Sequence, residues 1–440
     1  MTSVVMPSVA SSVRSSVHWG VAHGLPTLFL RRAAERGDLQ ARLIRLGAHG
    51  TGDVFDLIEE IRSQGPLYRS RIGYVATSHA AVRQLLTSDD FRTGLPTNDG
   101  ALGKVARWAA PRTLHPVEPP SLLVTEPPDH TRYRKLVTRV FTMRAVEKLR
   151  GRTEEIAADL LDALEPRASS PVDLVESYCA LLPVTVIAEI LGVPEEERAQ
   201  VLDFGSAAAP SLDLGLGYRR YRAVSRALER FDAWLSRHLD DLRREPGDNL
   251  LSELVAVRDG EEGLDESELK ATAGLVLAAG FETTVNLLGN GIALLHDHPE
   301  ERRRVLAEPS LWPNVVEEVL RLDPPVLLTA RMAAHDTELA GQQLRAGSMV
   351  TAILGGANRD PEVFADPQRF DVARPNARDH IAFSSGRHHC LGAQLARMEG
   401  DVGLRAIWER YPDLRLEPGA RRRETRILRG FERLPATLRP

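Results

Sequence analysis

The sequence predicts a mainly α-helical protein of the α+β class, with one large helix-rich domain and small β-sheets. The longest periodic segment, residues 265–296, is long and apolar enough to form a helix that crosses a whole domain. Strand-like runs are short and gather near the two ends of the chain. No Gly/Ser/Pro-rich linker or block of charge divides the 440 residues, although length alone would suggest about three domains.

Composition places the chain among ordinary soluble globular proteins. With 43% hydrophobic and 27% charged residues, it can bury a sizeable core. A formal net charge of −5 argues against a nucleic-acid partner. The two cysteines, Cys179 and Cys390, stand far apart in different contexts, so we expect no disulfide framework and a reducing, cytoplasmic location.

The first fifty residues contain neither the ~18 uninterrupted apolar residues that span a bilayer nor a basic segment followed by an apolar core. We therefore expect no transmembrane segment and no export signal. Residues 27–46 predict one amphipathic helix. The favoured interpretation packs its Leu/Ile stripe on the domain, and contact with a membrane surface stays open as the alternative. The arginines expected to face solvent are Arg31, Arg32, Arg36, Arg42 and Arg45.

Short elements follow. Residues 53–64 predict a helix, residues 67–70 and 72–76 predict strands, and residues 78–86 predict another helix. Residues 91–125 are rich in Gly and Pro and lack periodicity, which indicates a long loop. Loops of that length are usually functional or disordered.

Prolines precede a helix that begins near Asp129. Its His130 and Arg134 are four residues apart and share a face, which taken alone is most often a solvated surface. Cys179 stands among Leu, Val and Ile and is predicted to be a core residue. Residues 193–244 predict two amphipathic helices joined by a linker of small, apolar and hinge-permitting residues.

The long helix at residues 265–296 would span about 48 Å. Asp265 and Glu268 have the spacing of a capping box at its start. The centre of the helix, residues 279–284, sets an acid and two hydroxyls in an otherwise apolar segment. A packing notch made by Gly280 and the threonines explains this pattern as well as a functional site does.

Glu318 and Arg321 stand three residues apart in the helix expected at residues 313–322. Pairs at this spacing are common on surfaces, where each contributes a few tenths of a kcal/mol. Taken alone, this pair indicates nothing more than such a surface contact.

A cysteine between two glycines stands near the C-terminus, in residues 383–397, which read FSSGRHHCLGAQLAR. Gly386 and Gly392 permit a tight turn and a close approach of the backbone to a flat ligand. The periodic residues after Gly392 predict a helix, and a thiolate at a helix N-terminus is stabilised by the macrodipole. A lone cysteine such as Cys390 is more often a buried small hydrophobe. Zinc is less favoured, because the cysteine and the two histidines before it are too close together in the chain to surround one tetrahedral ion.

The order of residues in this stretch resembles the haem-binding loop of the cytochromes P450, the haem-thiolate monooxygenases. One departure is Ser384, where the family usually has glycine. Further family motifs follow in order from about residue 53 to the C-terminus. The resemblance therefore implies a haem-thiolate monooxygenase domain over residues 51–440, preceded by an N-terminal extension of unknown role at residues 1–50. The matching residues of the loop are Phe383, Gly386, His388, Cys390, Gly392, Leu395, Ala396 and Arg397.

The resemblance implies heme b, iron protoporphyrin IX, as the cofactor. Cys390 would be the proximal iron ligand, with a thiolate that pushes electron density onto the metal. His130 and Arg134 would meet one haem propionate, and Arg331 would meet the other. His388, in the cysteine loop, completes the set of residues expected to bind the cofactor.

The resemblance also assigns the unusual centre of the long helix to oxygen activation. Thr283 would hold dioxygen and a water, and Glu282 would relay protons. Glu318, Arg321 and Arg374 would form a buried triad with an architectural role.

The two helices of residues 193–244 would form a movable lid over the substrate channel. The expected substrate contacts carry almost no fixed charge, which favours a long or bulky apolar molecule. These contacts are Leu212, Leu214, Phe281, Val326, Leu327 and Leu328.

The reaction implied is insertion of one oxygen atom from O2 into an unactivated C–H bond, with two electrons from ferredoxin and ferredoxin reductase. Arg387, next to the cysteine loop, is expected to contact an acidic ferredoxin. A polyketide or macrolide-like lipid is favoured over a sterol or a fatty acid. A peroxide-using haem-thiolate enzyme would not need the acid and alcohol of the long helix, and a haem carrier or sensor would need neither the lid nor the proton relay.

Overall fold

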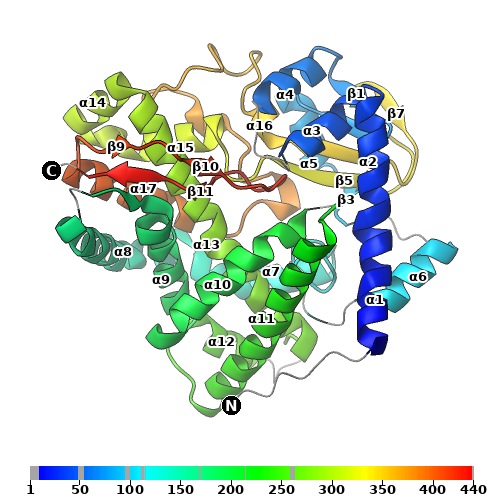
Figure 1. Cartoon of the computed structure of the whole chain (residues 1–440), viewed down its shortest axis with the longest axis horizontal. Coiled ribbons are helices and arrows are strands. Elements are labelled where there is room, and N and C mark those ends of the chain that lie inside the picture. Colours follow the sequence, from blue (N-terminus) through cyan, green and yellow to red (C-terminus); the bar gives the residue numbers. More distant parts are fainter. Residues whose placement is uncertain are drawn as a thin grey trace.

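The structure is a computed structural model that describes residues 9–47, 54–94, 100–110, 113, 115–167, 170–213, 215–257 and 263–438. Most of these residues are helical. Figure 1 shows a large helical part at the left and bottom, and a smaller part at the upper right that holds the main β-sheet with helices against it. The predicted fold class, mainly α-helical with small sheets, is confirmed.

The elements are these. The helices before the longest one are α1 (Val9–Trp19), α2 (Leu25–Glu35), α3 (Leu39–Gly47), α4 (Val54–Arg62), α5 (His79–Thr87), α6 (Ala101–Ala109), α7 (Asp129–Thr138), α8 (Met143–Leu164), α9 (Leu181–Ile190), α10 (Arg198–Ala208), α11 (Tyr218–Arg244) and α12 (Leu250–Val257). The longest helix and those after it are α13 (Glu266–Asp297), α14 (Pro299–Ala307), α15 (Trp312–Leu322), α16 (Leu354–Ala357) and α17 (Ala393–Arg410). The strands are β1 (Leu67–Arg69), β2 (Tyr74–Ala76), β3 (Phe91–Arg92), β4 (Val172–Asp173), β5 (Leu328–Ala333), β6 (Thr337–Leu339), β7 (Gln342–Leu344), β8 (Met349–Ile353), β9 (Arg415–Leu416), β10 (Arg421–Arg422), β11 (Phe431–Arg433) and β12 (Pro435–Thr437).

The largest sheet has the strand order β1-β2-β8-β5-β3. Strands β2 and β8 run parallel, and the other neighbours are antiparallel. Strand β5 pairs with β8 on one side, with Arg331 opposite Val350, and with β3 on the other. Because β5 is held on both edges, the position of Arg331 is fixed by the backbone ladder.

Helix α13 runs through the core and packs against α9, α15 and α17. Its predicted capping box is present, since Asp265 Oδ1 accepts from the Glu268 N–H at 2.8 Å and Glu268 Oε2 accepts from the Asp265 N–H at 2.9 Å. By length and apolar composition alone α13 would qualify as a membrane span, but most of its apolar window is buried inside the protein. Its hydrophobicity is therefore that of a core helix.

The N-terminal prediction needs two corrections. The single helix expected at residues 27–46 is two helices, α2 and α3, and α1 precedes them. The helix is interrupted at Gly37, which has φ +82°. The Asp38 carboxylate then caps α3 by accepting a hydrogen bond from the Ala41 N–H at 2.9 Å. A glycine followed by a capping acid ends one helix and begins the next.

The predicted boundary near residue 50 does not coincide with a break in packing. Leu39 and Leu43 of α3 share one hydrophobic cluster with Phe55 and Ile58 of α4. The long loop expected at residues 91–125 also contains structure, namely β3 and α6.

Candidate active site

Cys390 lies in a turn between a short 3-10 segment, Gly386–His388, and the start of α17. Its backbone N–H donates to the carbonyl of Phe383 at 2.9 Å. Burial raises the pKa of the Cys390 thiol, against the lowering effect of the Gly392 N–H and of two guanidinium groups. Cys390 nevertheless keeps exposed surface. The cysteine is therefore accessible to a ligand although protein surrounds it.

Gly386 fixes how this turn meets the rest of the protein. It has φ +68°, and a Cβ at this position would lie 2.4 Å from the backbone oxygen of Leu86, at the end of α5. The close approach expected of this glycine is therefore to protein backbone. Any larger residue would push the cysteine loop away from α5.

Ser384 takes the left-handed conformation that glycine adopts without cost. Its φ is +63°, and its buried hydroxyl has no hydrogen-bond partner among the described residues. The turn thus keeps the glycine geometry although the residue is serine, at a cost of about 1 kcal/mol.

We predict that Ser384→Gly stabilises the haem-loaded protein by about 1 kcal/mol, because glycine removes this backbone strain. The measurement is the shift in thermal midpoint. The matched control is Ser385→Gly, because Ser385 has an ordinary extended φ of −150°. Ser385→Gly should be neutral or destabilising. A lower midpoint for Ser384→Gly than for wild type would contradict the prediction.

Arg331 is a buried cation, with 6% of its surface exposed. Its Nη1 donates to Thr329 Oγ1 at 3.1 Å and to the Ala330 carbonyl at 2.8 Å. No carboxylate lies within ion-pair distance of it among the described residues, and burial lowers its pKa to about 10. A buried guanidinium with only neutral partners needs an anion.

His130 and His388 stand next to this arginine. Their ring centroids are 4.5 Å apart, and the buried Nε2 atom of each has no hydrogen-bond partner among the described residues. Burial, reinforced by the charge of Arg331, lowers the pKa of His388 to about 4. Glu126 Oε1 approaches His388 Nε2 at 3.5 Å.

These donors fit the two propionates of heme b. Arg134, whose charge is felt by the Cys390 thiol, donates to the Arg387 carbonyl at 3.3 Å, and burial lowers its pKa. Two arginines and two histidines without a full set of anionic partners thus gather around the cysteine loop. Two carboxylates placed there would satisfy the buried nitrogens that the protein leaves unpaired.

The centre of α13 has one accessible face. Ala279 is exposed and Thr283 is partly exposed in a helix that is otherwise largely buried. The two residues are four apart, so they lie on the same face of the helix. Thr283 Oγ1 donates to the Ala279 carbonyl at 3.1 Å, which holds the hydroxyl on that face.

Glu282 points elsewhere. Its carboxylate is buried, and Oε1 lies 3.0 Å from Nη1 of Arg423, in the C-terminal segment after β10. Burial raises the pKa of Glu282, and the charge of Arg423 opposes that rise. The structure thus separates the neighbouring acid and alcohol into two environments, which the sequence did not indicate.

Comparison with known proteins decides the family. Residues 104–426 match the family model described as Cytochrome P450. The chain is a cytochrome P450. It is 51% identical over 435 residues to a protein of Mycobacterium tuberculosis named as cytochrome P450 140, covering 97% of this chain and 98% of that one.

Two further relatives carry names that include a reaction. A Saccharopolyspora erythraea protein named 6-deoxyerythronolide B hydroxylase is 42% identical, over 71% of this chain and 77% of its own. A Pseudonocardia autotrophica protein named vitamin D(3) 25-hydroxylase is 39% identical, over 83% and 88%. Among solved structures, a myxobacterial cytochrome P450 in complex with myristic acid superposes with a TM-score of 0.79, at 33% identity, covering 88% of this chain and 96% of that one. The P450 family uses heme b, which agrees with the fit of the site.

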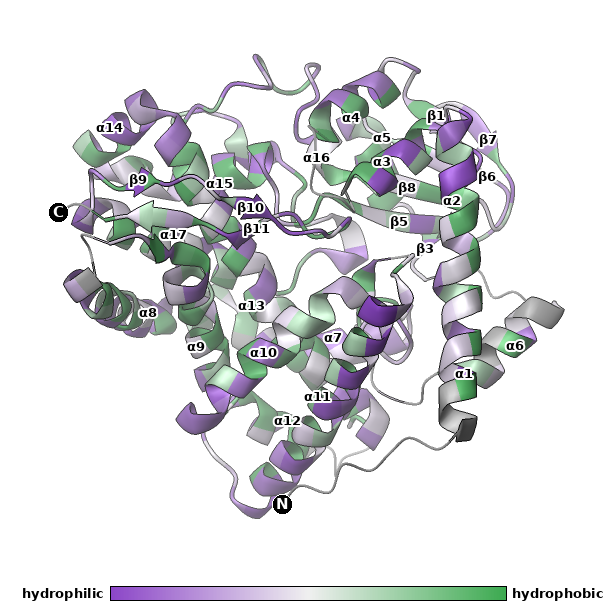
Figure 2. Cartoon of the chain, in the orientation of Figure 1, coloured by the Kyte–Doolittle hydropathy of each residue, from purple (hydrophilic) through white to green (hydrophobic). Residues whose placement is uncertain are grey.

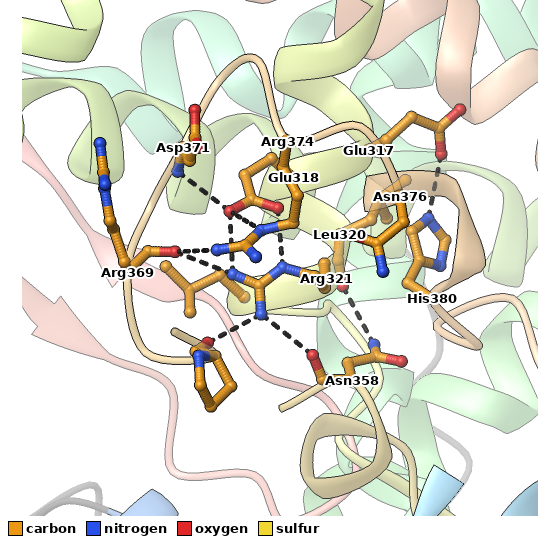
Figure 3. A network of polar contacts seen from close by, with 12 residues as sticks. Glu317, Glu318, Leu320, Arg321, Asn358, Arg369, Asp371, Arg374, Asn376 and His380 are labelled. Carbon is orange, nitrogen blue, oxygen red and sulfur yellow. Dashed lines mark hydrogen bonds and ion pairs between the residues drawn. The ribbon is translucent and has the colours of Figure 1, made fainter. Parts of the chain in front are cut away.

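The predicted architectural residues of this P450 lie together in the core, as Figure 3 shows. Arg321 donates to both oxygens of Glu318, at 2.7 and 2.8 Å, and Arg374 Nε donates to Glu318 Oε1 at 3.1 Å. Both members of the Glu318–Arg321 pair have fully buried side chains. Arg321 also donates to the carbonyls of Asn358 and Pro367, so the network ties α15 to the segment that leads to the cysteine loop.

A second link between α15 and the cysteine loop was not predicted. Arg397 Nε donates to Glu317 Oε1 at 2.8 Å, and its guanidinium lies 4.7 Å from the ring centroid of Phe383. His380 Nε2 lies 3.0 Å from the other oxygen of Glu317. The sequence offered only one signal for this link, the presence of Arg397 in the loop motif. Its partner, Glu317, lies 80 residues away in the chain, so the pairing could not be predicted.

Glu399 of α17 was also missed. It is buried, and burial raises its pKa well above the usual value, an effect that the nearby Thr284 hydroxyl of α13 opposes. Neither of its carboxyl oxygens has a hydrogen-bond partner among the described residues, and such burial favours the neutral acid. Nothing in the sequence around Glu399 indicates that this glutamate of α17 is buried.

The predicted substrate contacts divide into three groups. Leu212, Val326 and Leu328 are partly exposed and remain candidates. Phe281 and Leu327 are buried in the core, and this corrects their prediction.

The reason for the correction is side-chain direction. Phe281 points at α10, where a Cβ on Gly205 would lie 1.9 Å from its ring. Leu327 packs with Phe55 and Ile58 in a hydrophobic cluster and keeps only 4% of its surface exposed. Leu214 lies outside the described residues.

Arg387 is engaged within the protein. Its Nη1 donates to Glu126 Oε2 at 2.8 Å, and its Nη2 pairs with Asp89. Arg387 is therefore not a free cation, and a ferredoxin carboxylate would have to compete with two internal ones.

Proposed function

We propose that this P450 hydroxylates an apolar carbon of a polyketide or macrolide-like lipid, using O2 and two electrons delivered through ferredoxin reductase and ferredoxin. The observation that carries the proposal is that the residues expected to contact the substrate, and still accessible, are uncharged. Ala279, Thr283, Val326 and Leu328 carry no charge, and the nearest acid of α13, Glu282, pairs with Arg423. Such residues favour an apolar ligand that is oriented by shape.

The bound haem would supply oxygen activation and transfer, and this chain would supply orientation and protons. Thr283 Oγ1 would fix a water beside the haem, and its bond to the Ala279 carbonyl, which holds the hydroxyl on one face of α13, supports this role. Burial favours the protonated form of Glu282, and the guanidinium of Arg423 stabilises the carboxylate once the proton has left. Glu282, paired with Arg423, would thus donate a proton and be protonated again between turnovers.

We expect Thr283→Ala to bind haem and substrate as wild type does but to lower the yield of product per NAD(P)H by at least about tenfold, the lower end of what a positioned proton donor contributes. Reducing equivalents would go to hydrogen peroxide instead. Thr283→Ser, which keeps the hydroxyl, should restore most of the coupling. Equal coupling in wild type and Thr283→Ala would remove this residue from the proton path.

The names of the relatives support both the favoured substrate class and its alternative. One relative is named for a macrolide precursor and another for a secosteroid. The test compares binding spectra and turnover with 6-deoxyerythronolide B, vitamin D3 and myristic acid. Hydroxylation confined to the secosteroid or the fatty acid would overturn the polyketide assignment.

We propose a cytoplasmic enzyme that receives its electrons from an acidic ferredoxin. The internal pairing of Arg387 changes how this is tested, because Arg387→Glu would also place a second acid beside Glu126. Asp89→Asn is the better variant, because Asp89 is exposed and its loss leaves Arg387 paired with Glu126. The guanidinium nitrogen that paired with Asp89 then becomes available to a ferredoxin carboxylate. Faster reduction at low salt in that variant supports docking on this face, and an unchanged rate argues against it.

A further inference from the structure

Large hydrophobic side chains with high exposure are concentrated at one edge of the molecule. Six of the nine in the described part of the chain belong to three helices, α1, α2 and α6. Figure 1 shows α1 and α2 as one rod along the right edge, with α6 projecting beside it, and Figure 2 shows hydrophobic colour recurring on them. The six residues are Val13, Leu25, Leu28, Phe29, Val105 and Trp108.

On α2 the exposed residues form one face. Leu25, Leu28 and Phe29 are each about half exposed and lie at positions i, i+3 and i+4. Arg32 continues the same face one turn later and has no ion-pair partner among the described residues. The other side of α2 packs inward through Leu30 and Ala33, so the exposed face is not needed for packing on the domain.

The N-terminal segment that forms most of this edge is basic in a chain that is acidic overall, although Arg42 of α3 pairs with Glu60 of α4. The first fifty residues contain six arginines and two acidic residues, whereas the whole chain has a net charge of −5. Of the two acids, Asp38 is buried and caps α3, and Glu35 pairs with Arg31. Arg14 of α1 lies over the exposed Trp108 ring of α6 at 4.9 Å, which joins a cation to the apolar surface.

The rod is also attached to the proposed lid. The Trp19 indole N–H donates to the Leu216 carbonyl at 2.8 Å, just before α11. His18 and Ser16 of α1 contact the hydroxyls of Tyr221 and Tyr218 at 3.1 and 3.0 Å. Anything that binds the rod therefore lies beside the segment that covers the substrate channel.

We propose that the edge formed by α1, α2 and α6 docks this P450 on the surface of an anionic phospholipid bilayer. Leu25, Leu28 and Phe29 enter the boundary between headgroups and acyl chains, while Arg32 and Arg14 meet lipid phosphates. The combination of an apolar face with unpaired arginines selects a lipid surface over a neutral protein partner. The protein lies on the membrane without spanning it, with its lid next to the lipid phase.

The test uses the haem-loaded full chain and flotation with vesicles of equal parts phosphatidylcholine and phosphatidylglycerol. We expect wild type to float with these vesicles, to float less as salt rises, and to stay behind with pure phosphatidylcholine. The double variant Leu28→Gln/Phe29→Gln should partition at least about tenfold more weakly, because two large apolar side chains lose their burial. Arg32→Gln should weaken binding to the anionic vesicles alone.

Met143→Gln is the matched control, because Met143 is 70% exposed and belongs to α8, a helix that Figure 1 shows at the left, away from α1 and α2 at the right. It should float as wild type does. Failure of wild type to float, or equal flotation of wild type and the double variant, would overturn the proposal. The proposal would also be overturned if wild type sediments as a dimer without vesicles and the double variant sediments as a monomer. The exposed face of α2 would then bind a second copy of the chain. An unchanged haem spectrum in every variant shows that the fold is intact.

Discussion

Replacing Cys390 by serine is expected to lower monooxygenase turnover by roughly a thousandfold or more, which corresponds to about 4 kcal/mol of barrier height. The reason is chemical, because a serine hydroxyl cannot supply the thiolate that the cofactor needs for O–O cleavage. The fold around position 390 should persist, since the loop is held by backbone contacts such as the Cys390 N–H to the Phe383 carbonyl. The measurement is product formation with the tightest-binding substrate, per haem bound.

Cys179→Ala is the control for this variant. Cys179 is fully buried in the core, and burial raises the pKa of its thiol. Its loss should cost some stability and leave turnover per haem nearly unchanged. Turnover of Cys390→Ser within tenfold of wild type would show that the cysteine is not the ligand.

The second large effect is structural. Glu318→Ala is expected to destabilise the protein by about 3–5 kcal/mol, because it leaves two buried guanidinium groups, those of Arg321 and Arg374, without their carboxylate. The network joins α15 to the chain that carries the cysteine loop, so haem retention should fall as well. Thermal midpoint and haem content of the purified protein are the measurements.

The surface pair of Arg405 and Glu409 is the matched comparison. Its members lie 2.8 Å apart and are about half exposed. Glu409→Ala should cost no more than about 0.5 kcal/mol. A similar small cost for Glu318→Ala would mean that the triad has no architectural role.

Local signals predicted much of the fold and the turn that holds Cys390. The capping box of α13, the helix at residues 78–86 and the glycine-flanked cysteine turn all depend on residues within a few positions of one another. Interactions over so short a range are determined by the local sequence alone. That is why the prediction succeeded for these elements and for the family.

Features set by distant partners were missed. The pairing of Glu282 with Arg423 spans 141 residues, and the burial of Glu399 of α17 near Thr284 of α13 depends on the packing of two helices. Phe281 was assigned to the substrate site because the sequence does not show which face of α13 is turned toward that site. The packing of the Phe281 ring against Gly205 of α10 shows that this residue lies on a different face.

The single helix predicted at residues 27–46 failed for a different reason. The periodic pattern of α2 and α3 outweighed the stop signal of Gly37 and the start signal of Asp38. The exposed apolar face of α2 could not be distinguished from its packed face, because both contain leucine. Tertiary packing alone separates them.

Ligation of the haem iron by Cys390 is tested most directly by the visible spectrum of the reduced wild-type protein with carbon monoxide bound. We expect the long-wavelength Soret band of a haem with a cysteine thiolate ligand, formed in proportion to bound haem. A Soret band at the shorter wavelength of a haem with a neutral ligand, in freshly reduced protein that retains its cofactor, would contradict it.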